Sequence, residues 1–204
     1  VVRELAGSAA VSSLGVYTHF SSAETDADYT RLQLNHFRAA LEELASKNIY
    51  PALRHAANSY AAVHYPDSRF DMVRPGLAAY GLMDGFEPAL SLKSRIVFLK
   101  DMRPGLSVGY QRAFRTRKLT KLATIPIGYG DGYFRQLSNR AAVLIRGSRC
   151  RVAGNVSMDM ITVDVTHLDG VAVGDEVVLI GSQGADEIAA DDVAAWAGTI
   201  SYEV

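Results

Sequence analysis

The first 90 residues alternate apolar, strand-like runs with helical stripes, and this alternation constrains the fold more than any other feature. Strands are expected at 14–20, 49–55 and 70–73. Between the first two, a helix is expected from an apolar stripe at spacings of three and four residues, formed by Leu34, Phe37, Leu41 and Leu44. A shorter helix is expected at 59–64. Such alternation implies parallel strands with right-handed crossovers, in a doubly wound sheet or a (β/α) barrel.

The pattern changes near residues 87–92, which predicts a domain at 1–90 and a second domain at 91–204. Strand candidates follow at 92–99, 119–127, 141–145, 149–152, 160–165 and 176–180. Glycine-containing turns separate several of them, so we expect a small, mainly antiparallel barrel or sandwich. A last helix is predicted at 185–196, with Ile188, Val193 and Trp196 facing inward and an end at Gly198.

The expected strand count conflicts with a complete barrel. About three parallel strands cannot close an eight-stranded barrel, and an open remnant would leave sheet edges and apolar faces uncovered. We therefore expect the chain to be a fragment of a larger fold.

Composition narrows the function classes. With 21 basic and 22 acidic residues the net charge is -1, which provides no general attraction for nucleic acid or anionic membranes. No apolar run reaches the roughly 18 residues of a membrane span. The single cysteine, Cys150, fits a reducing compartment, so the cytoplasm is the expected location, and its alternation with two arginines predicts a thiol buried in a strand. The five histidines show no i, i+4 pair, so no metal site is predicted.

Polar residues collect where the first-half strands end. His19, the pair Asn58 and Ser59, and Arg74 would meet at the carboxyl ends of parallel strands, where ligands bind in both candidate architectures. Asn58 and Ser59 could bind an anion or simply cap a helix. Arg74 precedes Pro-Gly and could hold a phosphate or a planar acceptor, or belong to an ordinary turn.

Glycine-rich joints mark the second half at Gly109-Tyr110, 128–132 and 157–159. They could let the backbone approach a ligand closely, or be tight turns with packed tyrosines. The basic residues between 112 and 121 fit the exposed face and turn of a β-hairpin better than a nucleic-acid surface.

Read in order, these motifs resemble the bacterial alanine racemase family, which depends on pyridoxal 5'-phosphate (PLP). The motifs are GVYTHF at 15–20, HAANS at 55–59, DMVRPG at 71–76, IPIGYGDG at 125–132, SMD at 157–159 and YE at 202–203. The resemblance runs from about residue 14 to residue 204. It implies the C-terminal part of a (β/α)8 TIM-type barrel followed by a β domain that is incomplete at its end. It also implies a homodimer whose active site is shared across subunits.

The resemblance assigns roles residue by residue. It implies a catalytic group of Tyr110, His19 and Arg74, with Tyr110 as the base toward L-alanine and Arg74 on the pyridine nitrogen. The implied cofactor-binding residues are Asn58, Ser59, Arg74, Gly76, Leu77 and Tyr202. The implied substrate-binding residues are Met158, Tyr129 and Asp159. The implied reaction is racemisation of L- and D-alanine through a PLP aldimine by two bases, supplying D-alanine for peptidoglycan.

One departure from the family pattern concerns catalysis directly. No segment resembles the strand that carries the Schiff-base lysine, so the 204-residue chain alone is expected to be inactive. A milder departure is Ser157, where many relatives have cysteine. Two alternatives therefore stay open: a non-catalytic PLP-binding or dimerisation module, and a broad-specificity amino-acid racemase.

Overall fold

The computed structural model describes residues 2–204, and the chain divides into two compact units, 1–87 and 88–204. The division lies close to the change in sequence pattern. No helix within residues 2–204 is long and apolar enough to cross a membrane. Each unit has its own hydrophobic core.

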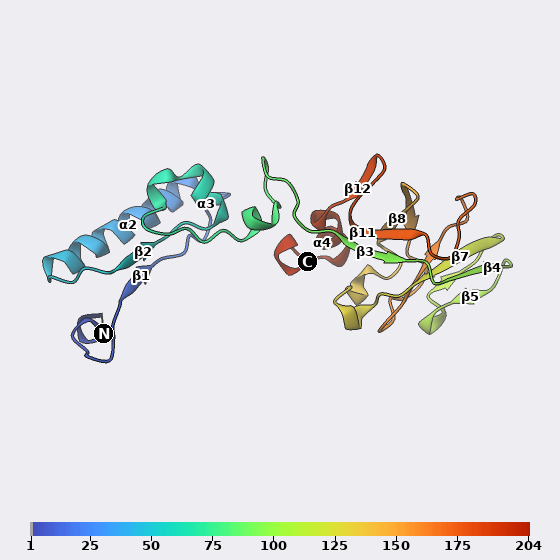
Figure 1. Cartoon of the computed structure of the whole chain (residues 1–204), viewed down its shortest axis with the longest axis horizontal. Helices are drawn as coiled ribbons and strands as arrows, with labels where there is room; N and C mark the ends of the chain where they lie inside the picture. Colours follow the sequence, from blue (N-terminus) through green and yellow to red (C-terminus); the bar gives the residue numbers. More distant parts are fainter. Residues whose placement is uncertain (1) are drawn as a thin grey trace. The chain divides into compact units, whose positions relative to one another are not determined.

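The first unit is built on a β-α-β motif (Figure 1). Strands β1 (Gly15–Tyr17) and β2 (Leu53–His55) pair in parallel, with Tyr17 opposite His55. Helix α2 (Ala27–Ser46) connects them, as predicted. The remaining elements are α1 (Val2–Ala6), α3 (Ser59–His64) and the 3-10 helices η1 (Pro66–Ser68) and η2 (Leu77–Tyr80).

Helix α2 begins where polar sequence chemistry predicts a start. The Asp26 side chain caps it by accepting a hydrogen bond from the amide of Tyr29 at 2.9 Å. The expected stripe faces the core: Leu34 and Phe37 are buried, and Leu41 packs against them. This unit's small core is completed by Phe20, Ala23, Ala56, Ala57 and Ala61.

The predicted third strand at 70–73 is wrong. Phe70 has a positive φ of 46°, and two backbone hydrogen bonds join the segment to the β2 region, from Asp71 N to Arg54 O and from Arg74 N to Ala57 O. The Arg54 amide donates instead to the Asp71 carboxylate at 2.8 Å. In a regular strand pair, the Arg54 amide would donate to a backbone carbonyl of the neighbouring segment. Because the Asp71 side chain accepts that hydrogen bond, residues 70–73 do not form a regular ladder with β2.

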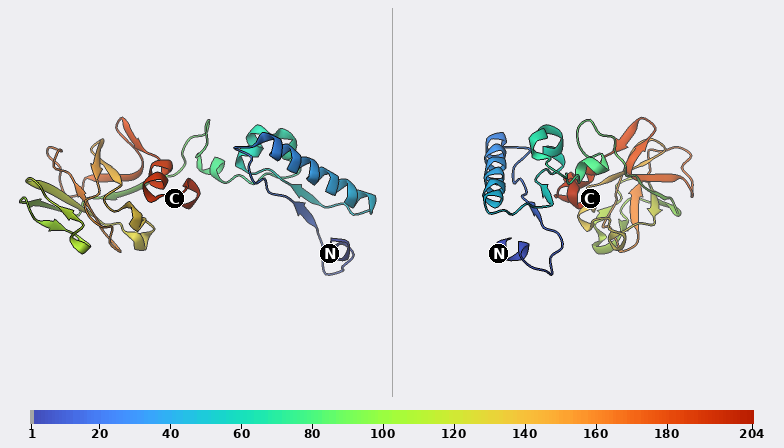
Figure 2. Two further views of the ribbon diagram at one scale, coloured as in Figure 1. Left: turned by 180° about the vertical axis from the view of Figure 1, so that it is seen from behind. Right: turned by 60° about the vertical axis from the view of Figure 1, so that its left-hand side comes forward.

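The second unit is a set of antiparallel sheets, as predicted (Figure 2). One sheet has the order β10-β7-β4 and another the order β12-β11-β8-β9, with β3 also paired to β11. A two-stranded ribbon, β5-β6, lies between β4 and β7 in sequence. The strands are β3 (Leu92–Arg95), β4 (Phe98–Met102), β5 (Ser107–Val108), β6 (Phe114–Arg115), β7 (Thr120–Ile125), β8 (Ala142–Ile145), β9 (Ser148–Arg151), β10 (Ile161–Asp164), β11 (Glu176–Gln183) and β12 (Asp186–Ile188). The helices are η3 (Tyr110–Arg112), η4 (Tyr129–Asp131), η5 (Arg135–Leu137), α4 (Ala190–Ala197) and η6 (Ser201–Glu203).

Two expected elements of this unit need correction. The single strand predicted at 92–99 is two strands, because Ile96 bonds to Asp175 while Val97 bonds to Thr124 of the other sheet. The helix predicted from residue 185 begins at Ala190, since β11 continues to Gln183 and turns back as β12. Ile188 is buried as expected, but it faces inward from a strand.

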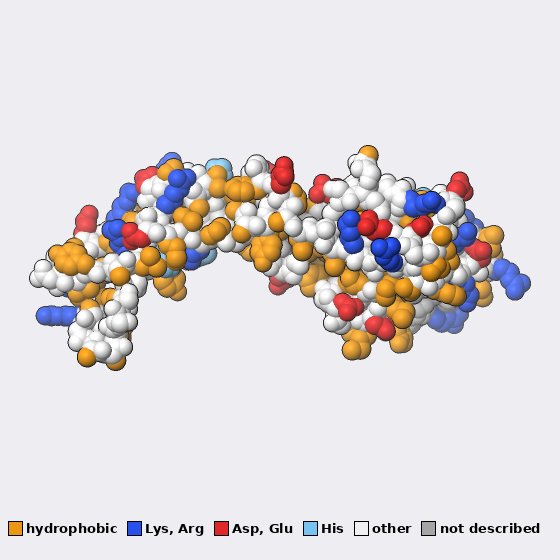
Figure 3. Space-filling view, in the orientation of Figure 1, with side chains coloured by type: hydrophobic (Ala, Val, Ile, Leu, Met, Phe, Trp, Pro, Cys, Tyr) orange, Lys and Arg blue, Asp and Glu red, His pale blue; other side chains and the backbone are white. Residues whose placement is uncertain are grey.

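The core of the second unit consists of aliphatic side chains from the strands, and it includes Cys150. The thiol is buried on β9, as predicted. Burial, and then the charge of Asp164, raise the pKa of this thiol to about 12. On the face of this unit drawn in Figure 3, acidic and basic side chains are interspersed.

Candidate functional site

Arg74 is the centre of a polar cluster in the first unit. Its Nη2 donates to the carbonyl oxygens of Thr18 at 3.0 Å and Ala56 at 3.1 Å, and it lies 3.1 Å from Nδ1 of His19. Its Nη1 lies 2.5 Å from Nδ1 of His55. The ends of β1 and β2 thus supply the acceptors that fix the guanidinium, as expected for the carboxyl ends of parallel strands.

His55 is the residue of this cluster that sequence reasoning left without a role. Burial, and then the positive charge of Arg74, lower the pKa of His55 from its ordinary value. Its ring stacks on Tyr17, with centroids 5.1 Å apart and planes 5° from parallel. The available signal was positional: His55 ends the strand predicted at 49–55, close to the polar residues that were expected to meet at the carboxyl ends of the strands.

Ser59 organises the second part of the cluster. Its hydroxyl oxygen accepts hydrogen bonds from the amides of Gly76 at 2.7 Å and Ala78 at 3.3 Å. The buried hydroxyl therefore holds the turn after Arg74 against the start of α3. Leu77 is the first residue of η2, so its amide has no acceptor within that helix. The predicted anion-binding residues Ser59, Gly76 and Leu77 thus lie in one neighbourhood.

Asn58 has a local structural role. Its side chain accepts a hydrogen bond from the amide of Ala61 at 2.9 Å and caps α3. This is the capping alternative left open by the sequence.

In the second unit, Tyr110 and Tyr129 line one cavity of about 300 Å³. The other lining residues are Gln111, Arg135, Asn155 and Val156. Tyr110 begins the 3-10 helix η3, and its side chain is 71% exposed. The next residue, Gln111, has a positive φ of 59°. The side-chain Nδ2 of Asn155 donates to the Tyr110 carbonyl oxygen at 3.0 Å. Asn155, which had no predicted role, therefore positions the backbone that presents Tyr110.

The loop carrying Met158 and Asp159 packs directly on the glycine-rich segment that carries Tyr129. The Tyr129 amide donates to Ser157 O at 2.9 Å, and the Gly130 amide donates to Met158 O at 2.7 Å. A Cβ at position 128 would lie 2.3 Å from Ser157 O, so glycine is required for this contact. The three predicted substrate residues therefore share one backbone-to-backbone junction.

Tyr202 lies in η6 of the second unit. The Ser201 hydroxyl of the same helix bonds to the carboxylate of Asp191 in α4, which holds η6 against that helix. Tyr202 is separate in the chain from Ser59, Gly76 and Leu77, the other predicted phosphate-binding residues, which belong to the first unit.

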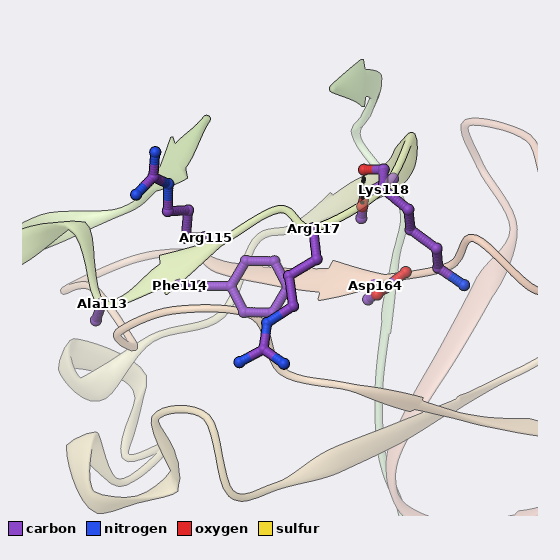
Figure 4. Close-up of a pocket in the computed structure, with 7 residues that line it drawn as sticks. Ala113, Phe114, Arg115, Arg117, Lys118 and Asp164 are labelled. Atoms are coloured by element: carbon purple, nitrogen blue, oxygen red, sulfur yellow. Dashed lines mark hydrogen bonds between the residues drawn. The ribbon is translucent and has the colours of Figure 1, made fainter. Parts of the chain in front are cut away.

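A larger cavity of about 540 Å³ contains none of the predicted site residues (Figure 4). It is lined by Ala113, Phe114, Arg115, Arg117, Lys118, Thr120 and Asp164. Of its basic residues, Arg115 lies on β6 of the β5–β6 hairpin, and Arg117 and Lys118 lie in the exposed segment that leads into β7. Within residues 2–204, no group of three or more His, Cys, Asp or Glu side chains could hold a metal ion.

Comparison with known proteins identifies the family. Residues 1–84 match the family described as "Alanine racemase, N-terminal domain", and residues 89–204 match "Alanine racemase, C-terminal domain". The alanine racemase of Symbiobacterium thermophilum is 47% identical over 99% of this chain and 56% of its own length. That of Halothermothrix orenii is 43% identical over 93% of this chain and 52% of its own length.

Solved structures lead to the same family. The alanine racemase of Bacillus anthracis with bound L-Ala-P superposes with a TM-score of 0.87 at 36% identity, covering 93% of this chain and 51% of that one. The enzyme from Streptomyces lavendulae gives a TM-score of 0.85 at 37% identity, covering 93% of this chain and 52% of its own. These structures confirm the fold class, part of a TIM-type barrel followed by an antiparallel β domain. The chain spans about half the length of the curated relatives it matches, and it belongs to the alanine racemase family.

Proposed function

We propose that this chain supplies part of the active site of a PLP-dependent enzyme that interconverts L-alanine and D-alanine. The observation that carries the proposal is the Arg74 cluster. A guanidinium has five N–H donors, and the hydrogen bonds of Arg74 within residues 2–204 use Nη1 and Nη2. The Nε–H group is left for a ligand acceptor such as a pyridine nitrogen.

The residues present fit this cofactor. The amides of Gly76 and Ala78 fix the Ser59 oxygen, which leaves the Ser59 hydroxyl hydrogen and the Leu77 amide as neighbouring donors suited to a phosphate. Arg74 would hold the ring nitrogen, and because a guanidinium stays protonated, it would donate a hydrogen bond without transferring a proton. When bound, PLP supplies a conjugated ring that stabilises negative charge at the substrate Cα.

Racemisation requires a proton to leave one face of Cα and another to arrive on the opposite face, so two acid-base groups are needed. Tyr110 is our candidate for the face from which L-alanine loses its proton. His19 and Arg74 would orient the reacting groups, and the backbone of Met158 would bind the substrate carboxylate. Tyr129 and Asp159 would limit the size of the substrate side chain. The second base would be a lysine outside the segments described above.

We further propose a homodimer in which Tyr110 of one subunit completes the site of the other. The exposure of several large apolar side chains in this part of the second unit supports an interface there. These are Leu106, Tyr110, Tyr129, Met158 and Met160. The unpaired thiol of Cys150 supports a cytoplasmic location, and the D-alanine formed would serve peptidoglycan synthesis.

The test is Cα proton exchange and racemisation by the complete protein with PLP. Deuterium from the solvent should enter both alanine enantiomers, and Tyr110→Phe should abolish exchange of the L-alanine Cα proton while largely sparing proton removal from D-alanine. Equal loss from both enantiomers would count against the role of Tyr110. PLP binding without any exchange would favour the non-catalytic module, and similar rates with larger amino acids would favour a broad-specificity racemase.

A further inference from the structure

We propose that Tyr17 is a positioning residue. Its ring holds His55 and Arg74 in the arrangement that leaves the Arg74 Nε–H group free for the pyridine nitrogen of PLP. The catalytic meaning of this role rests on the proposed function. The physical role, a ring that orients two hydrogen-bonded partners, rests on the geometry of the first unit alone.

The strand register brings the two rings together. Tyr17 and His55 are paired residues of neighbouring parallel strands, so their side chains leave the sheet on the same side. The backbone is fixed beside them, because the Thr18 amide donates to the His55 carbonyl at 3.2 Å. The rings consequently stack almost in parallel, with centroids 5.1 Å apart and planes 5° from parallel.

The same tyrosine ring also contacts the arginine. Cζ of Arg74 lies 5.6 Å from the centroid of the Tyr17 ring, within the range of a cation–π interaction. One aromatic ring thus touches both members of the hydrogen bond between Arg74 Nη1 and His55 Nδ1.

The donor and the acceptor of the hydrogen bond between Arg74 Nη1 and His55 Nδ1 can be assigned. A guanidinium can only donate, so Nδ1 of His55 must be the acceptor, and the proton of the neutral imidazole must lie on Nε2. A ring flip, or a proton on Nδ1, would remove the acceptor and release Nη1 of Arg74. The stack with Tyr17 opposes the flip, because rotation of the imidazole about its Cβ–Cγ bond must pass through orientations that break the parallel contact.

Tyr17 therefore acts on the reaction through His55 and Arg74. With Nη1 held by His55, and Nη2 held by Thr18 and Ala56, the plane of the guanidinium is fixed and so is the direction of its Nε–H bond. The aromatic ring carries this role, and the phenol hydroxyl is not required for it.

The first measurement is ¹⁵N NMR of histidine-labelled complete protein, with the His55 signals assigned by their loss in His55→Gln. The wild type should show a neutral imidazole with an unprotonated Nδ1. Tyr17→Phe should keep this state, whereas Tyr17→Leu should give signals averaged between the two tautomers. The matched control is Tyr50→Leu, because Tyr50 is 74% exposed and makes none of the ring contacts found within residues 2–204.

The second measurement is kinetic. Tyr17→Leu should lower kcat by about 10- to 100-fold with little change in KM, since misplacement of a positioning group costs rate and, in our proposal, Tyr17 acts through Arg74. Tyr17→Phe should stay within about threefold of the wild type. A shift of the PLP absorption band in Tyr17→Leu alone would independently report a disturbed ring-nitrogen contact.

Several outcomes would overturn the inference. A protonated Nδ1 in the wild type would do so without any variant, so the test survives if Tyr17→Leu does not fold. An unchanged tautomer in Tyr17→Leu, or equal defects in the Phe and Leu variants, would also reject the role of the ring. A wild type without racemase activity but with the expected tautomer would instead reject the proposed function and leave the inference standing.

Discussion

The carboxylate of Asp71 accepts three hydrogen bonds from Arg54. Its oxygens lie 2.8 Å from Nε, 2.8 Å from Nη2 and 2.8 Å from the backbone amide of Arg54. These hydrogen bonds, with the side chain of Arg54 first and its backbone amide second, lower the pKa of Asp71 to about 2. The contact ties the segment that leads to Arg74 onto β2.

The depressed pKa of Asp71 predicts acid sensitivity of the first unit. A carboxyl whose pKa falls on folding stabilises the folded state above its unfolded pKa, near 3.8, and loses that contribution as the pH falls toward about 2. The difference in urea midpoint between the wild type and Asp71→Asn should therefore be largest above pH 5 and shrink toward pH 2. A difference that is independent of pH over this range would contradict the assignment.

Ser59→Ala should weaken cofactor binding in the complete protein. The substitution removes the acceptor for two amides and, in our proposal, one donor to the phosphate, so a rise of about tenfold in the dissociation constant of PLP is expected. Fluorescence titration with PLP measures it. The control is Ser46→Ala, since Ser46 ends α2 and its hydroxyl bonds to the nearby Glu43 carbonyl. An equal effect of both substitutions would argue against a specific role for Ser59.

The junction between the glycine-rich segment and the Met158 loop predicts a graded series. Gly128→Ala would place Cβ 2.3 Å from Ser157 O, whereas Gly130→Ala would place it 2.9 Å from Met158 O. Both contacts are with backbone atoms, so the loop must shift. We therefore expect the free energy of unfolding to fall by about 1–3 kcal/mol, with the larger loss at position 128. Chemical denaturation of the two variants would measure these losses. A larger loss for Gly130→Ala than for Gly128→Ala would contradict the closer backbone approach at Gly128.

Tyr133→Phe should stabilise the protein. The Tyr133 hydroxyl is buried and has no hydrogen-bond partner among residues 2–204, and burial raises the pKa of this phenol. Removing an unpaired buried hydroxyl should gain about 1 kcal/mol in the free energy of unfolding. Tyr65→Phe is the matched control, because the Tyr65 hydroxyl donates to Ala23 O and its loss should bring no gain. A loss of stability in Tyr133→Phe would mean that the hydroxyl has a partner.

The buried thiol should be chemically silent in the folded protein. With its pKa raised to about 12, Cys150 is almost entirely protonated at pH 8, and the thiolate is the reactive form. Its reaction with a disulfide reagent should be slow in buffer and fast in denaturant. The reaction is followed by the absorbance of the thiol that the reagent releases. Fast reaction of the folded protein would contradict the burial of Cys150 on β9.

Sequence reasoning succeeded where local pattern and tertiary environment agree. The stripe through Leu34 and Phe37 identified α2, because a helix on a sheet must bury one face. The motifs also located the residues around Arg74, since parallel strands bring their carboxyl ends together.

The errors arose where a long-range contact decided the structure. The segment 70–73, with Phe70, Met72 and Val73, was predicted to be a strand, but the Asp71 side chain accepts the hydrogen bond from the Arg54 amide that strand pairing would use. Residues 186–188 are compatible with a helix start, but pairing with β11 makes them a strand. The only sequence signal for His55 was its place at the end of a predicted strand, because its role depends on the register with Tyr17 and on Arg74, which is 19 residues away.

The corner between β3 and β4 has a consequence for how the second unit opens. The Ile96 amide is bonded to Asp175 beside one sheet, and the next amide, that of Val97, is bonded to Thr124 of the other. Neither sheet can separate there without pulling on its neighbour, and the Ile96 side chain is fully buried between them. The two sheets should therefore exchange their amide hydrogens as one cooperative unit, with Ile96 and Val97 among the slowest to take up deuterium.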